Sequence, residues 1–160
     1  MGNIKLDNLS IDDYLAFHEN ITSNKRICDD FIIDHTFDIN VSKDILIDYL
    51  NRSLKDDFKI FAVRLDDVFI GIAMILYNKY PSIGYAIGSR YHNKGYGSKA
   101  VELLLAKIDP KYKIVNASVF STNIASIKVL EHNNFKAKKS EKMHYKGIIH
   151  EVILYEKKQP

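Results

Sequence analysis

The sequence predicts a mixed α/β domain in which the strands of one sheet alternate with helices. Three observations lead to this fold class. Two runs of β-forming residues, 58–65 and 68–77, are separated by only two residues, as in a hairpin. A glycine-bearing loop leads from a strand at 82–88 directly into a helix. Two further strand-like runs, at about 135–145 and 148–157, end the chain.

The first residues are expected to form a short strand at 3–7, followed by two helices. Ser10 is placed to cap the first helix, and Ser42 is expected to cap the second, whose buried stripe runs as far as Leu54. Residues 28–41 lie between the two helices and combine the apolar run Phe31-Ile32-Ile33 with the alternating residues Phe37, Ile39 and Val41. Their structure stays ambiguous at this level.

The later elements follow in a regular order. The hairpin turn is Asp66-Asp67, and its second strand is apolar on both faces, which places it centrally in the sheet. The helix after the glycine loop carries Ala100, Val101 and Leu104 inward. A strand at 113–120 and a short helix at 123–132 precede the last two strands. The order is therefore β-α-α-β-β-β-α-β-α-β-β.

Length and composition favour one globular domain spanning 1–160. Hydrophobic residues make up 46% of the chain, enough to build a core, and charged residues 27%. No apolar run is long enough to cross a bilayer and no signal peptide is recognisable, so we expect a cytoplasmic protein without a membrane partner. The single cysteine, Cys28, excludes an intrachain disulfide and a cysteine-built metal site, and no metal is expected.

Charge is distributed unevenly along the chain. Residues 1–80 hold nine Lys or Arg and 14 Asp or Glu, whereas residues 81–160 hold 14 Lys or Arg and six Asp or Glu. Such asymmetry is often no more than solvated surface. It would also suit an anionic ligand held by the C-terminal half and a cationic one attracted by the N-terminal half. Charge alone does not decide between these interpretations.

The glycine loop is the stretch most informative about function. A glycine-bearing loop that opens a helix directs several backbone N–H groups to one point, with the positive end of the helix behind them, which suits a phosphate. Arg90, Lys94 and Lys99 add positive charge nearby. An isolated Gly95-x-Gly97 is equally compatible with a plain strand–turn–helix connection.

Two nucleotide-binding motifs do not fit these residues. Gly95-x-Gly97-x-x-Ala100 matches a dinucleotide-binding fingerprint, but the next strand lacks the carboxylate that such a site requires. A P-loop needs Gly-Lys-Ser/Thr, whereas this chain has Gly97-Ser98-Lys99.

Three segments together resemble the GNAT N-acetyltransferases, in particular the branch that includes ribosomal-protein N-terminal acetyltransferases. They are Ile83-Gly84-Tyr85-Ala86-Ile87-Gly88, His92-Asn93-Lys94-Gly95-Tyr96-Gly97-Ser98-Lys99-Ala100, and the stretch from Asn123 to Glu131 that ends at Phe135. Two coupled motifs are more specific than either alone. The resemblance implies an acyl-CoA N-acyltransferase fold, with a mostly antiparallel central sheet, a splayed parallel strand pair at 82–88 and 113–120, and flanking helices.

The resemblance also implies acetyl-CoA as the acetyl donor, with its pyrophosphate on the glycine loop. The implied cofactor-binding residues are Ile87, Gly88, His92, Asn93, Lys94, Gly95, Tyr96, Gly97, Ser98, Asn123 and Ser126. His92 stands where the family usually has Gln or Arg, an exchange that backbone-made phosphate contacts should tolerate. Pantetheine would lie in the gap between the parallel strands, where an N–H near Ile87 or Gly88 could stabilise an oxyanion.

The catalytic residues that we predict are Ser126 and Tyr85. Many relatives carry a tyrosine general acid where this chain has Leu130, so Ser126, directly or through water, is the candidate that protonates the leaving thiolate. Asn123 and Ser126 share a helix face and can point at one ligand. Alternatively, Asn123 is only the helix cap and Ser126 is solvent-exposed.

A general base is harder to assign. No carboxylate occurs between Asp67 and Glu102, where many relatives place a glutamate. The remaining candidates are Tyr85, His144, Tyr145, His150 and Glu151. Attack by an already neutral amine, with water as relay, is equally allowed.

The predicted function is therefore acetyl-CoA-dependent transfer of an acetyl group to a primary amine, on a small molecule or a peptide or protein N-terminus, by direct attack. The alternative is a non-catalytic acyl-CoA-binding or sensing domain, favoured by the missing carboxylate and tyrosine. The lysines of 136–146 form no recognisable nucleic-acid motif, so no nucleic-acid partner is expected. The protein is expected to be a monomer or a homodimer.

Overall fold

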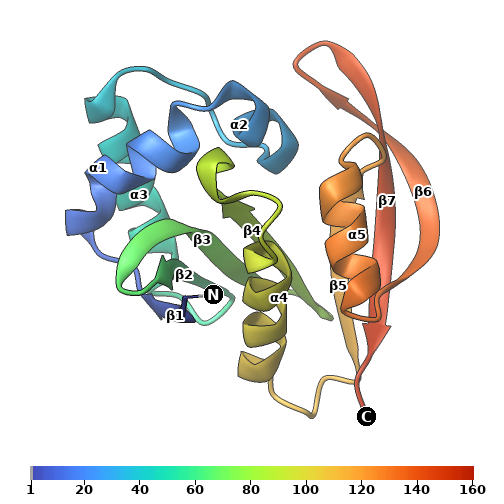
Figure 1. The fold of residues 1–160 in the computed structure, drawn as a ribbon. Coiled ribbons are helices and arrows are strands. Elements are labelled where there is room, and N and C mark those ends of the chain that lie inside the picture. Colours follow the sequence, from blue (N-terminus) through green and yellow to red (C-terminus); the bar gives the residue numbers. More distant parts are fainter. Residues whose placement is uncertain (1) are drawn as a thin grey trace.

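The computed structural model describes residues 2–160 and contains one seven-stranded sheet in the order β1-β2-β3-β4-β5-β7-β6 (Figure 1). The strands are β1 (Ile4–Asn8), β2 (Phe58–Leu65), β3 (Val68–Tyr77), β4 (Pro81–Ile87), β5 (Ile114–Phe120), β6 (Lys136–Tyr145) and β7 (Ile148–Lys158). Every neighbouring pair is antiparallel except β4 and β5, which are parallel. The predicted fold class is confirmed.

Helices cover both faces of this sheet. They are α1 (Tyr14–Phe17), α2 (Lys25–Phe31), α3 (Ile39–Arg52), α4 (Tyr96–Lys107) and α5 (Ile124–His132). A π-helical segment, His18–Thr22, continues α1. No helix within residues 2–160 is long and apolar enough to cross a membrane.

The sheet separates two hydrophobic cores. On one face α4 contributes Ala100, Val101 and Leu104, as predicted, and on the other face the N-terminal helices contribute Phe17 and Leu46. Side chains of a strand point alternately to the two faces. On β4, therefore, the side chains of Ile83, Tyr85 and Ile87 belong to the α4 face and that of Ala86 belongs to the opposite face.

The parallel strands β4 and β5 diverge. Within residues 2–160 the two strands pair only at Ser82 and Asn116, whereas every residue of β4 pairs with β3. Beyond Ser82 the edge of β4 that faces β5 is therefore unpaired, and the sheet opens between the two strands.

The start of α3 differs from the prediction that Ser42 would cap it. The helix begins at Ile39, and its cap is Asp38, whose Oδ1 accepts from the N–H of Asn40 at 2.9 Å. Ser42 is instead buried within the helix, where its hydroxyl lies 2.7 Å from His18 Nδ1 and 2.6 Å from Thr22 Oγ1.

Leu54 was also assigned wrongly to the buried stripe of α3. Its side chain is 82% exposed, because α3 ends at Arg52 and the chain has left the helix before Leu54.

The ambiguous residues 28–41 include most of α2. Asn24 caps this helix through its Oδ1, which accepts from the N–H of Ile27 at 3.1 Å, and Ile32 ends it in a left-handed conformation. The helix packs closely on β4, since a Cβ at Gly84 would lie 3.3 Å from the Phe31 ring. The absence of a side chain at Gly84 thus lets α2 approach the diverging strands.

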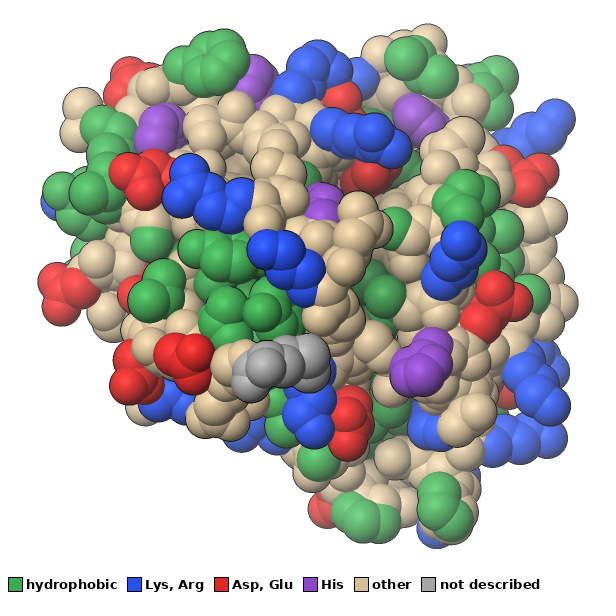
Figure 2. Space-filling view, viewed as in Figure 1, with side chains coloured by type: hydrophobic (Ala, Val, Ile, Leu, Met, Phe, Trp, Pro, Cys, Tyr) green, Lys and Arg blue, Asp and Glu red, His purple; other side chains and the backbone are tan. Residues whose placement is uncertain are grey.

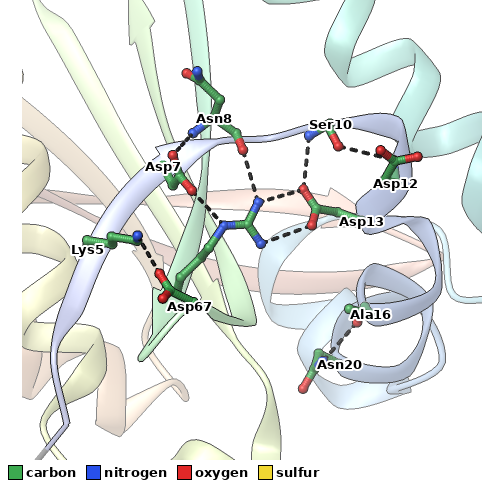
Figure 3. A network of polar contacts seen from close by, with 10 residues as sticks. Lys5, Asp7, Asn8, Ser10, Asp12, Asp13, Ala16, Asn20 and Asp67 are labelled. Atoms are coloured by element: carbon green, nitrogen blue, oxygen red, sulfur yellow. Dashed lines mark hydrogen bonds and ion pairs between the residues drawn. The ribbon is translucent and has the colours of Figure 1, made fainter.

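A polar network holds the first helical turns against β1 and β2 (Figure 3). Arg64 on β2 donates to Asp7 at 2.9 Å and to Asp13 at 3.0 Å, and its third nitrogen donates to the carbonyl of Asn8. Ser10 caps the turn as predicted, in a capping box with Asp13. These contacts fix where the chain leaves the sheet for the N-terminal helices.

The β6–β7 hairpin forms the other edge of the sheet. β6 is the outermost strand, and nearly all its residues are exposed. The hairpin turns at Lys146 and Gly147, close to α2, since the Lys146 ammonium lies 3.7 Å from Asp29 Oδ1. Figure 1 shows this tip and α2 at the same end of the molecule.

Candidate functional site

A cavity of about 350 Å³ lies where β4 and β5 diverge. Its walls come from β4, β5, the glycine loop with the start of α4, α5, and α2. The loop and α5 lie on one face of the sheet, and α2 lies on the other. The cavity therefore passes through the opening in the sheet and has a glycine-loop end, lined by Asn93 and residues 95–98, and an α2 end, lined by Ile27, Asp30 and Phe31.

The glycine-loop end is built largely from backbone. Gly95 has a φ of 82°, a left-handed conformation that favours glycine, and a Cβ there would meet nothing within 4 Å. No described side chain caps the α4 N-terminus, whereas α2, α3 and α5 are capped by Asn24, Asp38 and Asn123. The N–H groups of the first turn of α4 thus face open space at the positive end of the helix, which suits an anion.

Basic side chains surround this end of the cavity. Lys128 on α5 lines it, and Arg90 and Lys94 belong to the loop. Lys99 is paired with Glu102 at 3.2 Å. Figure 2 shows Lys and Arg side chains on both sides of the hollow between α4 and α5. The local charge therefore favours an anionic ligand.

The end of β4 presents one backbone N–H to the cavity. The Gly88 N–H donates to the Ile70 carbonyl on β3 at 2.8 Å, and Gly88 does not line the cavity. Successive residues of a strand direct their N–H groups to opposite edges, so the N–H of Ile87 faces β5. His92 Nε2 donates to the Ile87 carbonyl at 2.6 Å and ties the loop to the strand. Of the two possible oxyanion donors, the geometry favours Ile87.

Tyr85 and Ser126 meet in the middle of the cavity. The Tyr85 hydroxyl lies 3.1 Å from Ser126 Oγ, across the space between β4 and α5. Burial raises the pKa of Tyr85 above its ordinary value, so its hydroxyl stays protonated at neutral pH and is a hydrogen-bond donor rather than a base. The ring packs against the start of α4, since a Cβ at Gly97 would lie 3.0 Å from it.

Asn123 is the cap of α5 and is also one of the residues around the cavity. Its Oδ1 accepts from the N–H of Ser126 at 3.2 Å. Apart from Gly88 and Lys94, every residue predicted for the site lines this one cavity.

The α2 end was missed by sequence reasoning. Ile27, Asp30 and Phe31 share one face of α2 at the spacing i, i+3, i+4, and Asn24 precedes them as a cap. That spacing was a readable signal, but the apolar alternation further along 28–41 obscured it. Asp30 is the one carboxylate among the cavity-lining residues.

The other candidate bases lie elsewhere. None of His144, Tyr145, His150 and Glu151 lines the cavity, and His150 stacks on Phe120 at 4.5 Å between ring centroids. Cys28 is buried, and burial raises the pKa of its thiol to about 11, so it is no nucleophile at neutral pH. Within residues 2–160 no group of three or more potential metal ligands lies together.

The comparison that decides the family is the match of residues 3–136 to the sequence profile of the acetyltransferase (GNAT) domain. The chain belongs to this family. Membership supports acetyl transfer in general, without naming the acceptor. No curated protein sequence matches the chain.

Solved structures share this GNAT fold along almost the whole chain. An acetyltransferase from Salmonella typhimurium that modifies the N-terminal serine of ribosomal protein L7/L12 has a TM-score of 0.86 and 16% identity, covering 98% of this chain and 95% of that one. RimJ of Mycobacterium smegmatis, in complex with CoA-disulfide, has a TM-score of 0.83 and 18% identity, covering 98% and 82%. The ribosomal-protein branch indicated by the sequence motifs is thus among the neighbours.

A third neighbour is the microcin C7 self-immunity acetyltransferase MccE, in complex with acetyl-CoA and AMP. It has a TM-score of 0.84 and 15% identity, and the match covers 97% of this chain and 92% of that one. GNAT proteins with this fold therefore include enzymes whose described roles differ, which leaves the acceptor of the present chain to be inferred from its own residues.

Proposed function

We propose that this GNAT protein is an acetyl-CoA-dependent N-acetyltransferase whose acceptor is a primary amine, on a small molecule or a peptide or protein N-terminus. The observation that carries the proposal is the cavity itself. It joins an uncapped helix N-terminus, the Tyr85–Ser126 hydroxyl pair and a carboxylate on the opposite face of the sheet. Donor and acceptor can thus enter from opposite faces and meet between β4 and β5.

The residues of the glycine-loop end fit the donor. Acetyl-CoA supplies an acyl group that is activated as a thioester, and its pyrophosphate is an anion. The N–H groups at the start of α4 would hold that anion, and the open space at Gly95 leaves room for it. Lys128 and Lys94 add charge of the right sign.

The residues in the middle of the cavity would promote direct attack by the amine. The Ile87 N–H donates to the carbonyl oxygen as negative charge develops on it. Ser126 gives its proton to the sulfur as the carbon–sulfur bond breaks, and regains one from the amine nitrogen through water. Tyr85 donates a hydrogen bond to Ser126 Oγ, so the serine hydroxyl proton points away from Tyr85 and is free to reach the sulfur. Tyr85 is therefore a positioning residue.

The test is CoA release from acetyl-CoA in the presence of an amine panel, with acetylated products identified by mass. Amine-dependent release is expected. CoA binding without release for any polyamine, aminoglycoside, amino acid or short peptide would favour the non-catalytic alternative. Two sequence observations support that alternative: β4 carries no carboxylate, and Leu130 stands where many members of the family have a tyrosine.

We further propose that the chain acts as a single domain, 1–160, in the cytoplasm, as a monomer or homodimer, with no nucleic-acid or membrane partner. The sequence of β6 supports the absence of a nucleic-acid partner. Its basic residues lie on an exposed strand, but no aromatic side chain is interleaved with them before Tyr145. A gel shift at several salt concentrations tests it.

A further inference from the structure

We infer that Asp30 binds the ammonium group of the acceptor and selects primary amines that carry no carboxylate next to the nitrogen. The inference rests on the proposed function, since it names the substrate class of the same cavity. It concerns a residue on α2, which none of the family motifs includes.

The position of Asp30 is the first argument. It lies on the α2 face that lines the cavity, between Ile27 and Phe31, on the side of the sheet opposite the glycine loop. Phe31 touches β4 at Gly84, next to Tyr85, so this part of α2 borders the diverging strands directly. A ligand held at Asp30 therefore reaches the Tyr85–Ser126 pair through the opening in the sheet. Its ammonium group releases one proton to solvent, and the neutral amine that remains attacks the thioester.

The lack of a partner is the second argument. The adjacent Asp29 is paired with Lys25 at 2.5 Å and lies 3.7 Å from the Lys146 ammonium. By contrast, no side chain or backbone group within residues 2–160 hydrogen-bonds or ion-pairs with the Asp30 carboxylate, which is half-buried. A partly desolvated carboxylate gains most from an incoming cation that also donates hydrogen bonds.

The electrostatic surroundings agree with this role. Burial raises the pKa of Asp30, and the negative charge of Asp29 adds to this, while Arg26 and His150 oppose it. Burial is the largest of these influences. The protein thus neutralises the negative charge of the Asp30 carboxylate only in part. An ammonium group at hydrogen-bond distance would supply the missing positive charge.

The same charge explains what is excluded. An amine with a carboxylate on the neighbouring carbon would bring a second anion beside Asp30, whose own carboxylate is already partly desolvated. The flanking side chains of Ile27 and Phe31 favour an apolar group beside the nitrogen. Arylalkylamines, and peptide amino termini whose first residue is apolar, satisfy both conditions, whereas free amino acids do not.

The experiment compares phenylalaninamide with phenylalanine, which differ in the amide or carboxylate next to the ammonium. Each is titrated into CoA-loaded protein by calorimetry, for the wild type, Asp30→Asn, Asp30→Glu and Asp48→Asn. Asp48 is an exposed α3 carboxylate, so its substitution removes the same charge away from the cavity. CoA affinity is measured for every variant as the folding control.

We expect wild type and Asp48→Asn to bind phenylalaninamide at least tenfold more tightly than phenylalanine. Asp30→Asn should lose about tenfold in phenylalaninamide affinity, with CoA affinity unchanged, and Asp30→Glu should recover part of the loss. Equal phenylalaninamide affinity in wild type and Asp30→Asn overturns the inference, as does wild-type preference for phenylalanine. Selective binding without release of CoA from acetyl-CoA would instead support the Asp30 assignment and overturn the proposed function.

Discussion

The two ends of the cavity are built from different parts of the chain. At the glycine-loop end the polar groups that face the cavity are backbone N–H groups of Gly95, Gly97 and the first turn of α4. At the α2 end they are side chains, with Asp30 between Ile27 and Phe31. Backbone N–H groups remain when most side chains are substituted, whereas a single substitution at Asp30 removes the carboxylate of the α2 end. The first end is therefore suited to a donor shared by a family, and the second to an acceptor particular to one protein.

The largest effect should come from breaking the glycine-loop end with Gly97→Val. Even a Cβ at this position would lie 3.0 Å from the Tyr85 ring, so valine must displace the tyrosine as well as crowd the N–H groups. We expect CoA affinity to fall by about 100-fold, since overpacking of this kind costs up to about 3 kcal/mol. Calorimetry with CoA measures it.

Ala106→Val is the matched control for Gly97→Val, because Ala106 is an exposed residue of the same helix. It should keep the affinity of the wild type. A folded Gly97→Val protein, judged by its thermal transition, that binds CoA normally would show that the start of α4 is not the donor site.

An effect of similar size, on kcat rather than on CoA affinity, is expected where the two ends meet. Ser126→Ala should lower kcat by about 100-fold while leaving CoA affinity unchanged, because the serine proton is needed only as the sulfur departs. Steady-state kinetics with an active acceptor, together with CoA titration, separates the two quantities. Ser140→Ala, on exposed β6, is the control. Weaker CoA binding with unchanged kcat would reassign Ser126 to the donor pocket.

Tyr85→Phe should have a more modest consequence, because it removes one hydrogen bond to Ser126 rather than the proton donor. We expect kcat to fall about fivefold. Because burial raises the pKa of Tyr85, the hydroxyl stays protonated until the pH exceeds the ordinary tyrosine value of about 10. Wild type and Tyr85→Phe should thus share the same kcat profile from about pH 7 to 10, differing only in scale. If kcat of the wild type rises or falls with pH in this range and kcat of Tyr85→Phe does not, Tyr85 is the titrating group.

The smallest effect tests whether the acidic N-terminal half helps Asp30 from a distance. Raising salt from about 0.01 M to 1 M shortens the Debye length from about 30 Å to 3 Å. The ratio of kcat/KM for phenylalaninamide to that for phenylalanine should therefore fall about threefold, a size typical of exposed charges. A ratio near one at every salt concentration would show that the charge asymmetry of the chain has no part in acceptor choice.

The contrast between the two ends also explains what the sequence could predict. The glycine loop, the hairpin turn at Asp66-Asp67 and the α5 motif are local patterns, so their positions could be identified before the structure. Tyr85 and Ser126 are 41 residues apart, and only the placement of α5 across the cavity from β4 brings their hydroxyls together. Their contact could not be inferred from spacing.

The errors have the same origin. Ser42 has the right residue type for a cap, but Asp38 lies one turn earlier and takes that role, because a buried site beside His18 and Thr22 holds the serine. Asp30 is one of several aspartates in the N-terminal half, and no local pattern separates it from Asp29. What separates them is tertiary: Asp29 meets the lysine at the tip of the hairpin, whereas Asp30 faces the cavity.

The lysines of β6 have a consequence for how the protein behaves at high concentration. β6 is an outer strand of ten residues whose free edge could accept a strand from another molecule. Its pairing with β7 shifts between Ala137 and Lys139, and the strand carries four lysines: Lys136, Lys138, Lys139 and Lys142. Irregular pairing and repeated like charge both oppose edge-to-edge addition. These residues therefore protect the molecule from aggregation through its longest exposed edge, and replacing them with apolar residues would remove that protection.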